Sequence, residues 1–498
     1  MPVARPGASR WVALGLPLLL LAAGVAASLW PLWVFLALLL GGAVVYVAWL
    51  LPTLPIREAF LPLRWWQVLW FLTLISGWVF RQRTVTEASD NPLDSAALFR
   101  VACMGLVALG VHSIAVSRKV EIITPMFKGV FLLLTLFNLL CLASYIWSVN
   151  PAWTLYRSIE HTVDIILVAT MVATFTGVSD YRRLMNWTWV LIGLELSTLL
   201  IGVVLAPHKA IVPGFGLLGF EILGVYPVFS RNGIGDSGSL IAAVALARLA
   251  TSSGNKRLFW GLLMLGLGIM FISQTRSAIA AFVLVLPLVL LVTRRLSWIA
   301  GVVLLAFAAI TITNIGGTFD QYWSRNESAG QISTLSGRTE FWQIAWDQAQ
   351  EQPWTGYGAF AGGRFVVAEQ TGYATLSSTH GTLPQVLVDT GFPGVALVLA
   401  AVVAVWWYVG RAAMWGRRDT EEERATWALS VEAMAVMTII TVRAFFDIAV
   451  IWHPAMSFLA VVAYAEYLRR SAATARRAAQ PDAGPVFKTA EPAVDGLL

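Results

Sequence analysis

Long apolar runs dominate the sequence and restrict the folds that the chain can adopt. The runs are about 16 to 25 residues long, the length that a helix needs to cross the hydrocarbon core of a bilayer. Of the 498 residues, 58% are hydrophobic and only 12% are charged, whereas about a quarter of the residues in a soluble domain are charged. The sequence therefore predicts an all-α, polytopic membrane protein.

Fourteen runs are long enough to be predicted as transmembrane helices. Basic residues precede the first run, as they do in a signal peptide. However, a second run follows at once and no convincing cleavage site separates them, so we predict a retained helix. The predicted spans are 12–30, 32–51, 65–80, 96–116, 126–147, 162–178, 186–206, 235–251, 258–275, 277–293, 297–313, 383–410, 426–446 and 448–468.

The short loops between these runs set the orientation through their content of Lys and Arg. With the N-terminus placed in the cytoplasm, each inner loop carries at least two basic residues. Membrane topology therefore accounts for the net charge of +6, and we predict no binding of nucleic acid. The Ala- and Pro-rich residues 469–498 are predicted to form a disordered cytoplasmic tail.

Two sizeable loops then lie on the extracytoplasmic side, at 207–234 and at about 314–382. The second loop is too long for a simple connection, and loops of this size are usually functional or disordered. It contains GRTEFWQIAWDQAQEQPW, in which aromatic and apolar residues recur at helical spacing before a proline. We predict an amphipathic surface helix here.

The sequence indicates no metal site. Cys103 and Cys141 both fall inside apolar runs, so we predict buried thiols and not a disulfide. The outer loops contain no Asp-x-Asp pair for a metal–nucleotide substrate, and His380 has no further ligand at a suitable spacing. We therefore expect the chain to need neither a metal ion nor another cofactor.

Several basic residues oppose the positive-inside pattern because they lie on the predicted outer side. They are Arg231, Arg276, Arg338, Arg364 and His380. An arginine near hydrocarbon is costly and usually has an anionic partner. For Arg276 we favour a bound ligand, because no acidic residue lies within several positions. Arg231 has Asp236 nearby, so structural pairing or snorkelling explains it equally well.

Two or three arginines on one face of the bilayer would suit a phosphate or diphosphate, because a guanidinium group binds phosphate oxygens two at a time. A neutral imidazole at His380 could accept a proton, although a single loop histidine is more often structural. His112 and His161 are predicted at the ends of spans, and His453 is predicted to bond to helix backbone.

Arg443 and Asp447 are four residues apart in a predicted span. This spacing places their side chains on one helix face, where we predict a structural ion pair.

Three segments, in this order, resemble the O-antigen ligase and polysaccharide polymerase (Wzy-type) superfamily. The first has an Arg-Ser-Ala element that opens a span, the second has Gly-Arg followed by Trp and then Pro with Gly-x-Gly, and the third has a histidine before a span with Gly-x-x-Gly. The segments are FISQTRSAIAA, GRTEFWQIAWDQAQEQPWTGYGAF and STHGTLPQVLVDTGFPGVALVL. The resemblance covers about residues 225–410, and WSVNPAWTLYRS resembles a recurring upstream segment.

The resemblance implies a metal-independent, inverting GT-C-type glycosyltransferase in the bacterial plasma membrane. Such an enzyme takes a glycan from an undecaprenyl-diphosphate carrier and transfers it, on the outer face, to a hydroxyl of an acceptor glycan, lipid or protein. By position, Arg276 and Arg231 would bind the diphosphate, and His380 would be the general base or orient the acceptor. Arg338 would be structural or contact the substrate, and Trp342 is a candidate for sugar contact.

Ligase members of this family have twelve spans, so the resemblance implies a twelve-helix core with an added N-terminal hairpin. We accordingly expect the hairpin and a cytoplasmic loop in residues 1–60, and the transmembrane glycosyltransferase core in residues 61–468, including loop 314–382. The sequence does not decide between a ligase and a polymerase. A transporter or flippase of lipid-linked oligosaccharides is the alternative from another class; it predicts paired halves, and no internal symmetry is visible.

Overall fold

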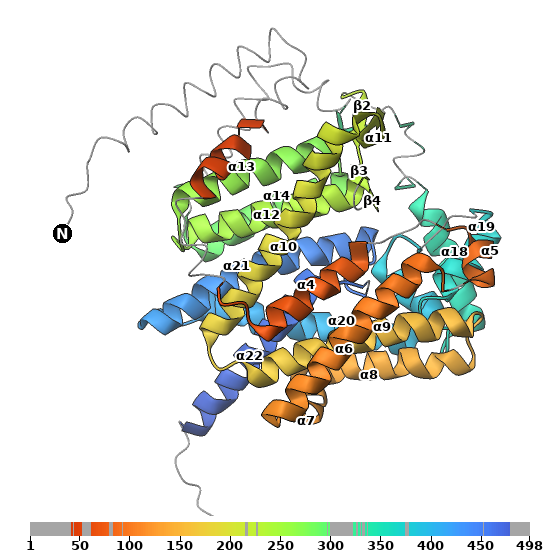
Figure 1. The fold of residues 1–498 in the computed structure, drawn as a ribbon, viewed down its shortest axis with the longest axis horizontal. Helices are drawn as coiled ribbons and strands as arrows, with labels where there is room; N and C mark the ends of the chain where they lie inside the picture. Colours follow the sequence, from red (N-terminus) through yellow and green to blue (C-terminus); the bar gives the residue numbers. More distant parts are fainter. Residues whose placement is uncertain are drawn as a thin grey trace, which may run out of the picture.

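The computed structural model describes residues 41–42, 44–51, 61–78, 83–91, 93–214, 218–225, 228–295, 297–298, 322–324, 327–328, 330, 334–335, 337–373, 378–451 and 453–478. Within these ranges the chain forms a bundle of long helices with two small β-hairpins (Figure 1). The predicted fold class, an all-α membrane protein, agrees with this architecture.

The elements follow in chain order, with the labels of Figure 1. They are α4 (Trp65–Trp78), α5 (Val85–Asp90), α6 (Ser95–Arg118), α7 (Ile123–Met126), α8 (Gly129–Ala143), η2 (Ser144–Ile146), α9 (Pro151–Thr174), α10 (Val178–Leu205), α11 (Pro207–Ala210), β1 (Ile211–Pro213), β2 (Phe220–Ile222), β3 (Gly224–Val225), β4 (Val228–Phe229), α12 (Arg231–Ala250), α13 (Lys256–Ile272), α14 (Arg276–Val292), α18 (Arg338–Glu351), the π-helix η3 (Gly362–Val367), α19 (Ala368–Thr371), α20 (Thr382–Trp415), α21 (Glu421–Phe446) and α22 (Met456–Ala478).

The predicted spans from 65–80 to 277–293, and the last three spans, each coincide with a described helix. Among the described residues, 6 helices are long and apolar enough to cross a bilayer: Ser95–Arg118, Gly129–Ile146, Val178–Leu205, Arg231–Ala250, Thr382–Trp415 and Glu421–Phe446. The predicted span 12–30, half of 32–51 and almost all of 297–313 lie outside the described residues.

Helix α9 starts well before the predicted span 162–178. Asn150 caps the helix, its side chain accepting a hydrogen bond from the Trp153 backbone N–H at 3.1 Å, and Pro151 occupies the first turn. The first turns carry charged residues that are buried and paired, as in the ion pair of Glu160 with Arg157. His161 therefore lies buried within the helix, and its predicted place at a span end was wrong.

Helix α22 starts later than the predicted span 448–468, because residues before Met456 are not helical. His453 lies in this non-helical segment, with ring Nδ1 2.6 Å from Asp164 Oδ2 and ring Nε2 2.7 Å from Ser76 Oγ. The prediction that His453 bonds to helix backbone was wrong, because the imidazole joins two side chains from other helices.

The same helix continues past residue 468 to Ala478, into the predicted tail. Glu466 accepts hydrogen bonds from Arg469 at 2.7 Å and from Arg470 at 3.1 Å. These pairs at spacings of three and four residues support the helical extension. Residues 479–498 lie outside the described residues.

Both cysteines are free and buried, as the sequence predicted. Cys103 lies in α6 and Cys141 in α8.

Close packing of glycines brings the first turns of α12 and α14 together. A Cβ at Gly235 of α12 would lie 2.5 Å from the side chain of Thr275, the residue before α14. The Thr275 hydroxyl donates a hydrogen bond of 3.1 Å to the backbone carbonyl of Arg231. Small residues allow such close helix contacts, and here they place Arg231 near Arg276.

A break at Gly391 divides α20. Gly391 has φ 66° and ψ −166°, a backbone conformation that favours glycine, and a Cβ there would collide with the backbone of Pro353. The first part of α20 thereby packs against the segment that follows α18.

The predicted surface helix is confirmed as a helix, α18, which ends before Pro353. Phe341 and Ala345 are buried, and α18 packs against α20. Its location at the membrane surface stays a prediction.

The loop 207–234 contains two antiparallel hairpins, β1 with β2 and β3 with β4. Each strand is only 2 or 3 residues long. A run this short shows no alternating pattern, so the sequence analysis did not predict the hairpins.

Candidate functional site

Four arginines from different elements lie near one end of the helix bundle. We call Arg231, Arg276, Arg338 and Arg443 the arginine cluster. Arg231, Arg276 and Arg338 are the first residues of α12, α14 and α18, and Arg443 lies in the last turn of α21. The charges of the other three all act on Arg338, so each of them is within electrostatic reach of Arg338.

Arg443 is the most deeply buried member of the cluster, with 2% of the residue exposed. Its Nη2 lies 2.9 Å from Asp447 Oδ2, which confirms the predicted ion pair. Its guanidinium group also pairs with Asp236 of α12 and donates a hydrogen bond to the Ser277 hydroxyl of α14. Arg443 therefore links α21 to the two helices that carry Arg231 and Arg276.

Arg276 and Arg231 each pair with a carboxylate from another segment. Arg276 Nη2 lies 2.5 Å from Glu327 Oε2, and Arg231 pairs with Glu221 of β2. These four side chains are between 18% and 32% exposed. The two guanidinium groups are therefore partly open to solvent.

Arg338 carries a charge in an unfavourable setting. Burial lowers its pKa, and repulsion from Arg443, Arg276 and Arg231 lowers it further, while Asp447 acts in the opposite direction. Its guanidinium carbon lies 5.8 Å from the centre of the Phe446 ring. Arginine stays protonated in proteins, so this repulsion favours the binding of an anion.

His380 lies just before α20 and within electrostatic reach of Arg338, one member of the cluster. Burial lowers the pKa of its imidazole, Asp447 raises it and Arg338 lowers it. The ring centre is 6.0 Å from that of Phe341, and φ of His380 is 54°, an uncommon value for a residue other than glycine. The lowered pKa favours a neutral ring that can accept a proton.

Trp342 holds the segment that contains His380. Its indole N–H donates a hydrogen bond of 3.1 Å to the Thr379 carbonyl. The Thr382 hydroxyl in turn donates to the Asp447 carbonyl at 2.9 Å. These two bonds connect α18, the start of α20 and the end of α21, so Trp342 has a positioning role beside its predicted sugar contact.

The structure does not bring Arg364 into the cluster. Arg364 lies 4.8 Å from the Trp153 ring and donates to the Arg83 carbonyl at 3.2 Å. Burial, Arg83 and Arg157 lower its pKa to about 10.

Among the described residues, no group of three His, Cys, Asp or Glu side chains could hold a metal ion.

The acidic partners of the arginines in the site were not predicted from the sequence. It treated Asp236 as a neighbour of Arg231, but Asp236 pairs with Arg443. Helix geometry argues against a pair between Arg231 and Asp236, because residues five apart in a helix of 3.6 residues per turn point about 140° away from each other. Glu221 and Glu327 come from loops, where no periodic pattern identifies a partner.

Residues 261–399 match a protein family whose description is O-antigen ligase. The matched range includes Arg276, Arg338 and His380, and Arg231 and Arg443 lie outside it. This finding confirms the resemblance seen in the sequence. The chain has no significant match among curated proteins.

Proposed function

We propose that the chain transfers a glycan from an undecaprenyl-diphosphate carrier to an acceptor hydroxyl, a function supported by the match of residues 261–399 to the O-antigen ligase family. The reaction is an inverting, GT-C-type transfer on the outer face of the bacterial plasma membrane. The acceptor belongs to a glycan, a lipid or a protein, so the enzyme is a ligase or a polymerase. No observation favours the transporter alternative.

The grouping of three arginines and His380 around Arg338 supports this proposal. Breaking the bond between the glycan and the diphosphate builds negative charge on the departing oxygens. Arg276 and Arg231 are accessible enough to bind these oxygens, and the charge of Arg338, on which the other three arginines act by repulsion, adds to the local positive field. Preorganised charges lower the barrier when they bind the transition state more tightly than the ground state.

His380 supplies the base in this proposal. The acceptor hydroxyl loses its proton to the imidazole as its oxygen bonds to the anomeric carbon, and the diphosphate leaves from the opposite side of that carbon. Asp447, whose charge raises the pKa of His380, stabilises the imidazolium that forms. A base within hydrogen-bond reach contributes about 10²- to 10⁴-fold to the rate.

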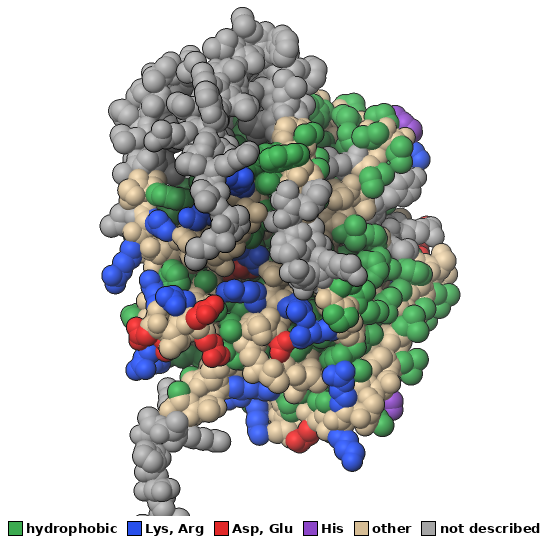
Figure 2. All heavy atoms as spheres, turned by 60° about the vertical axis from the view of Figure 1, so that its left-hand side comes forward, with side chains coloured by type: hydrophobic (Ala, Val, Ile, Leu, Met, Phe, Trp, Pro, Cys, Tyr) green, Lys and Arg blue, Asp and Glu red, His purple; other side chains and the backbone are tan. Residues whose placement is uncertain are grey.

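The outer-face location rests on the distribution of basic residues. Figure 2 turns the left-hand side of Figure 1 forward and shows many Lys and Arg side chains on that face. The arginine cluster lies at the other end of α12 from Arg248 and at the other end of α21 from Arg424. The positive-inside pattern therefore supports an outer location for the cluster.

Replacing Arg276 with alanine tests the proposed diphosphate site. One charge-assisted contact is worth about 1.5–3 kcal/mol, so we expect kcat/KM for a diphosphate-linked glycan donor to fall by about 10- to 150-fold. Arg276→Lys keeps the charge without the guanidinium fork and should give an intermediate value. The measurement is glycan transfer by the purified chain in proteoliposomes, with the exposed His208→Ala variant as control.

Two outcomes would contradict the proposal. Unchanged kcat/KM in Arg276→Ala would remove the diphosphate site. Movement of the lipid-linked donor across the bilayer without cleavage of its glycan bond would favour the transporter. The glycans of a deletion strain separate the two enzyme classes, since single repeat units indicate loss of a polymerase and long unattached chains indicate loss of a ligase.

The lowered pKa of His380 predicts an unusual pH profile. A base must be neutral, so kcat/KM should stay constant as the pH falls through about 6.5, the ordinary pKa of histidine, and decline only in more acidic solution. Arg338→Gln removes a repulsion, raises the pKa and should move the decline to higher pH. Asp447→Asn removes an attraction and should move it to lower pH. A shift of both variants in the same direction would exclude this arrangement.

A further inference from the structure

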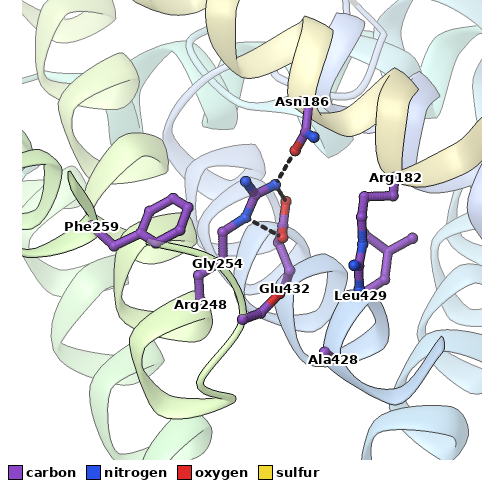
Figure 3. Close-up of a pocket in the computed structure, with 9 residues that line it drawn as sticks. Arg182, Asn186, Arg248, Gly254, Phe259, Ala428, Leu429 and Glu432 are labelled. Carbon is purple, nitrogen blue, oxygen red and sulfur yellow. Dashed lines mark hydrogen bonds and ion pairs between the residues drawn. The ribbon is translucent and has the colours of Figure 1, made fainter. Parts of the chain in front are cut away.

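A polar cavity lies near the opposite end of α12 and α21 from the arginine cluster. It has a volume of about 150 Å³ (Figure 3). Its charged and amide side chains come from α10, α12 and α21, and the ring of Phe259 from α13 forms an apolar wall. They are Arg182, Asn186, Arg248 and Glu432, and Ser253 also lines the cavity. The cavity takes no part in the proposed transfer, so its assignment stands independently of that proposal.

Arg248 and Glu432 form a bidentate ion pair at this cavity. Arg248 Nε lies 2.7 Å from one carboxylate oxygen of Glu432, and Nη2 lies 2.8 Å from the other. The Trp189 indole N–H also donates to Glu432 at 2.6 Å. Both oxygens of the carboxylate are thus occupied, and the charge of Glu432 is compensated by Arg248.

Arg182 adds a second positive charge to the cavity. Its Nη2 donates to the Ala425 carbonyl at 3.3 Å, and within the described ranges it forms no ion pair with a carboxylate. In Figure 3 the side chain of Arg182 lies across from Arg248, on the other side of Glu432. The two arginines and one carboxylate leave the cavity with a net positive charge.

Asn186 supplies a further donor. Its side-chain oxygen accepts a hydrogen bond of 2.6 Å from Arg248 Nη2, so its amide nitrogen is left to donate. That nitrogen turns to the side of Arg182 in Figure 3. The cavity therefore offers N–H donors from two side chains, whereas the Glu432 oxygens already accept hydrogen bonds from Arg248 and Trp189.

A ligand with several negatively charged oxygens fits this arrangement. The volume of about 150 Å³ is well above the ~10–15 Å³ that one water molecule needs on the same measure, so the cavity has room for a phosphate group. Guanidinium groups bind phosphate oxygens two at a time. We propose that this cavity binds a phosphate group, supplied by the headgroup of an anionic phospholipid or by free phosphate.

The test uses the full-length chain in detergent and measures the melting temperature Tm. The probes are phosphatidylglycerol, the zwitterionic phosphatidylcholine and inorganic phosphate. We expect phosphatidylglycerol or inorganic phosphate to raise the Tm of the unmodified chain, and Arg182→Gln to lose at least half of that rise. Arg257→Gln, which changes an exposed arginine at the start of α13 that does not line the cavity, should keep the full rise.

Asn186→Asp distinguishes loss of phosphate binding from loss of folding. The aspartate can still accept the hydrogen bond from Arg248, but it replaces a donor with a negative charge, so it should abolish the rise while the fold stays intact by circular dichroism. A rise with phosphatidylglycerol alone identifies a lipid headgroup, and a rise with phosphate that removes the lipid effect identifies a soluble ligand. Equal rises in the unmodified chain, Arg182→Gln and Asn186→Asp, or no rise with either anionic probe, would overturn the proposal.

Discussion

His380→Ala is expected to lower the rate of glycan transfer by about 10²- to 10⁴-fold, the usual contribution of a general base. The imidazole lies within electrostatic reach of Arg338 and Asp447, and burial lowers its pKa. Without it, the acceptor hydroxyl must give its proton to water. Single-turnover transfer by the purified chain measures this loss directly, because product release does not then limit the rate.

The matched control is His208→Ala, which removes an exposed histidine from the predicted outer loop 207–234. We expect this variant to keep the full rate. The KM for the lipid-linked donor should change little in His380→Ala, because the proposed contacts with the diphosphate come from arginines. A variant that keeps the fast rate, or that loses only donor binding, would exclude His380 as the base.

Three of the candidate site residues could be identified from the sequence, because each one interrupts or borders a regular hydrophobic pattern. Arg276 interrupts two apolar runs, Arg338 opens an amphipathic helix, and His380 precedes a long apolar run. An arginine at the head of a span, such as Arg276, is costly without an anionic partner or ligand. Their closeness could not be predicted from the runs themselves, because it depends on contacts such as that between Gly235 and Thr275.

The acidic partners could not be predicted, because ion pairs in this fold join residues that are distant in sequence. Glu327 reaches Arg276 from a loop, and Asp236 reaches Arg443 from another helix. Only Arg443 and Asp447, which share one helix, had a spacing that predicts a pair. A carboxylate in a loop has no periodic neighbour to give such a signal.

Hydropathy also fails where polar groups are buried in pairs. The predicted span 162–178 starts later than α9, because charged residues such as Arg157 and Glu160 are usually found in loops. In this structure the two residues form an ion pair inside the bundle. The segment before α22 was predicted to be helical because its residues are apolar, yet His453 bonds to Asp164 and Ser76 instead. An apolar run measures the tendency to enter a bilayer and does not describe the partners found there.

Arg443→Met is expected to have the largest effect on stability, with a loss of about 3 kcal/mol in the free energy of unfolding. Removal of one partner from a buried ion pair costs about 3–5 kcal/mol, since the other charge is left without compensation. The lower end of this range applies because the side chains of Asp236 and Asp447 are 25% and 36% exposed, while that of Arg443 is 2% exposed. Denaturant unfolding in a fixed detergent, followed by circular dichroism, measures the difference.

A combined variant separates the ion pairs from simple packing. If uncompensated carboxylates cause the loss, Arg443→Met together with Asp236→Asn and Asp447→Asn should recover about half of it, since contacting residues couple by about 0.5–3 kcal/mol. Glycan transfer should stay low in this triple variant, because Arg443 links α21 to the first turns of α12 and α14. If the triple variant is less stable than Arg443→Met, the methionine side chain and not the lost charge pairing limits the stability. If it regains transfer, the arginine cluster does not need Arg443 for its geometry.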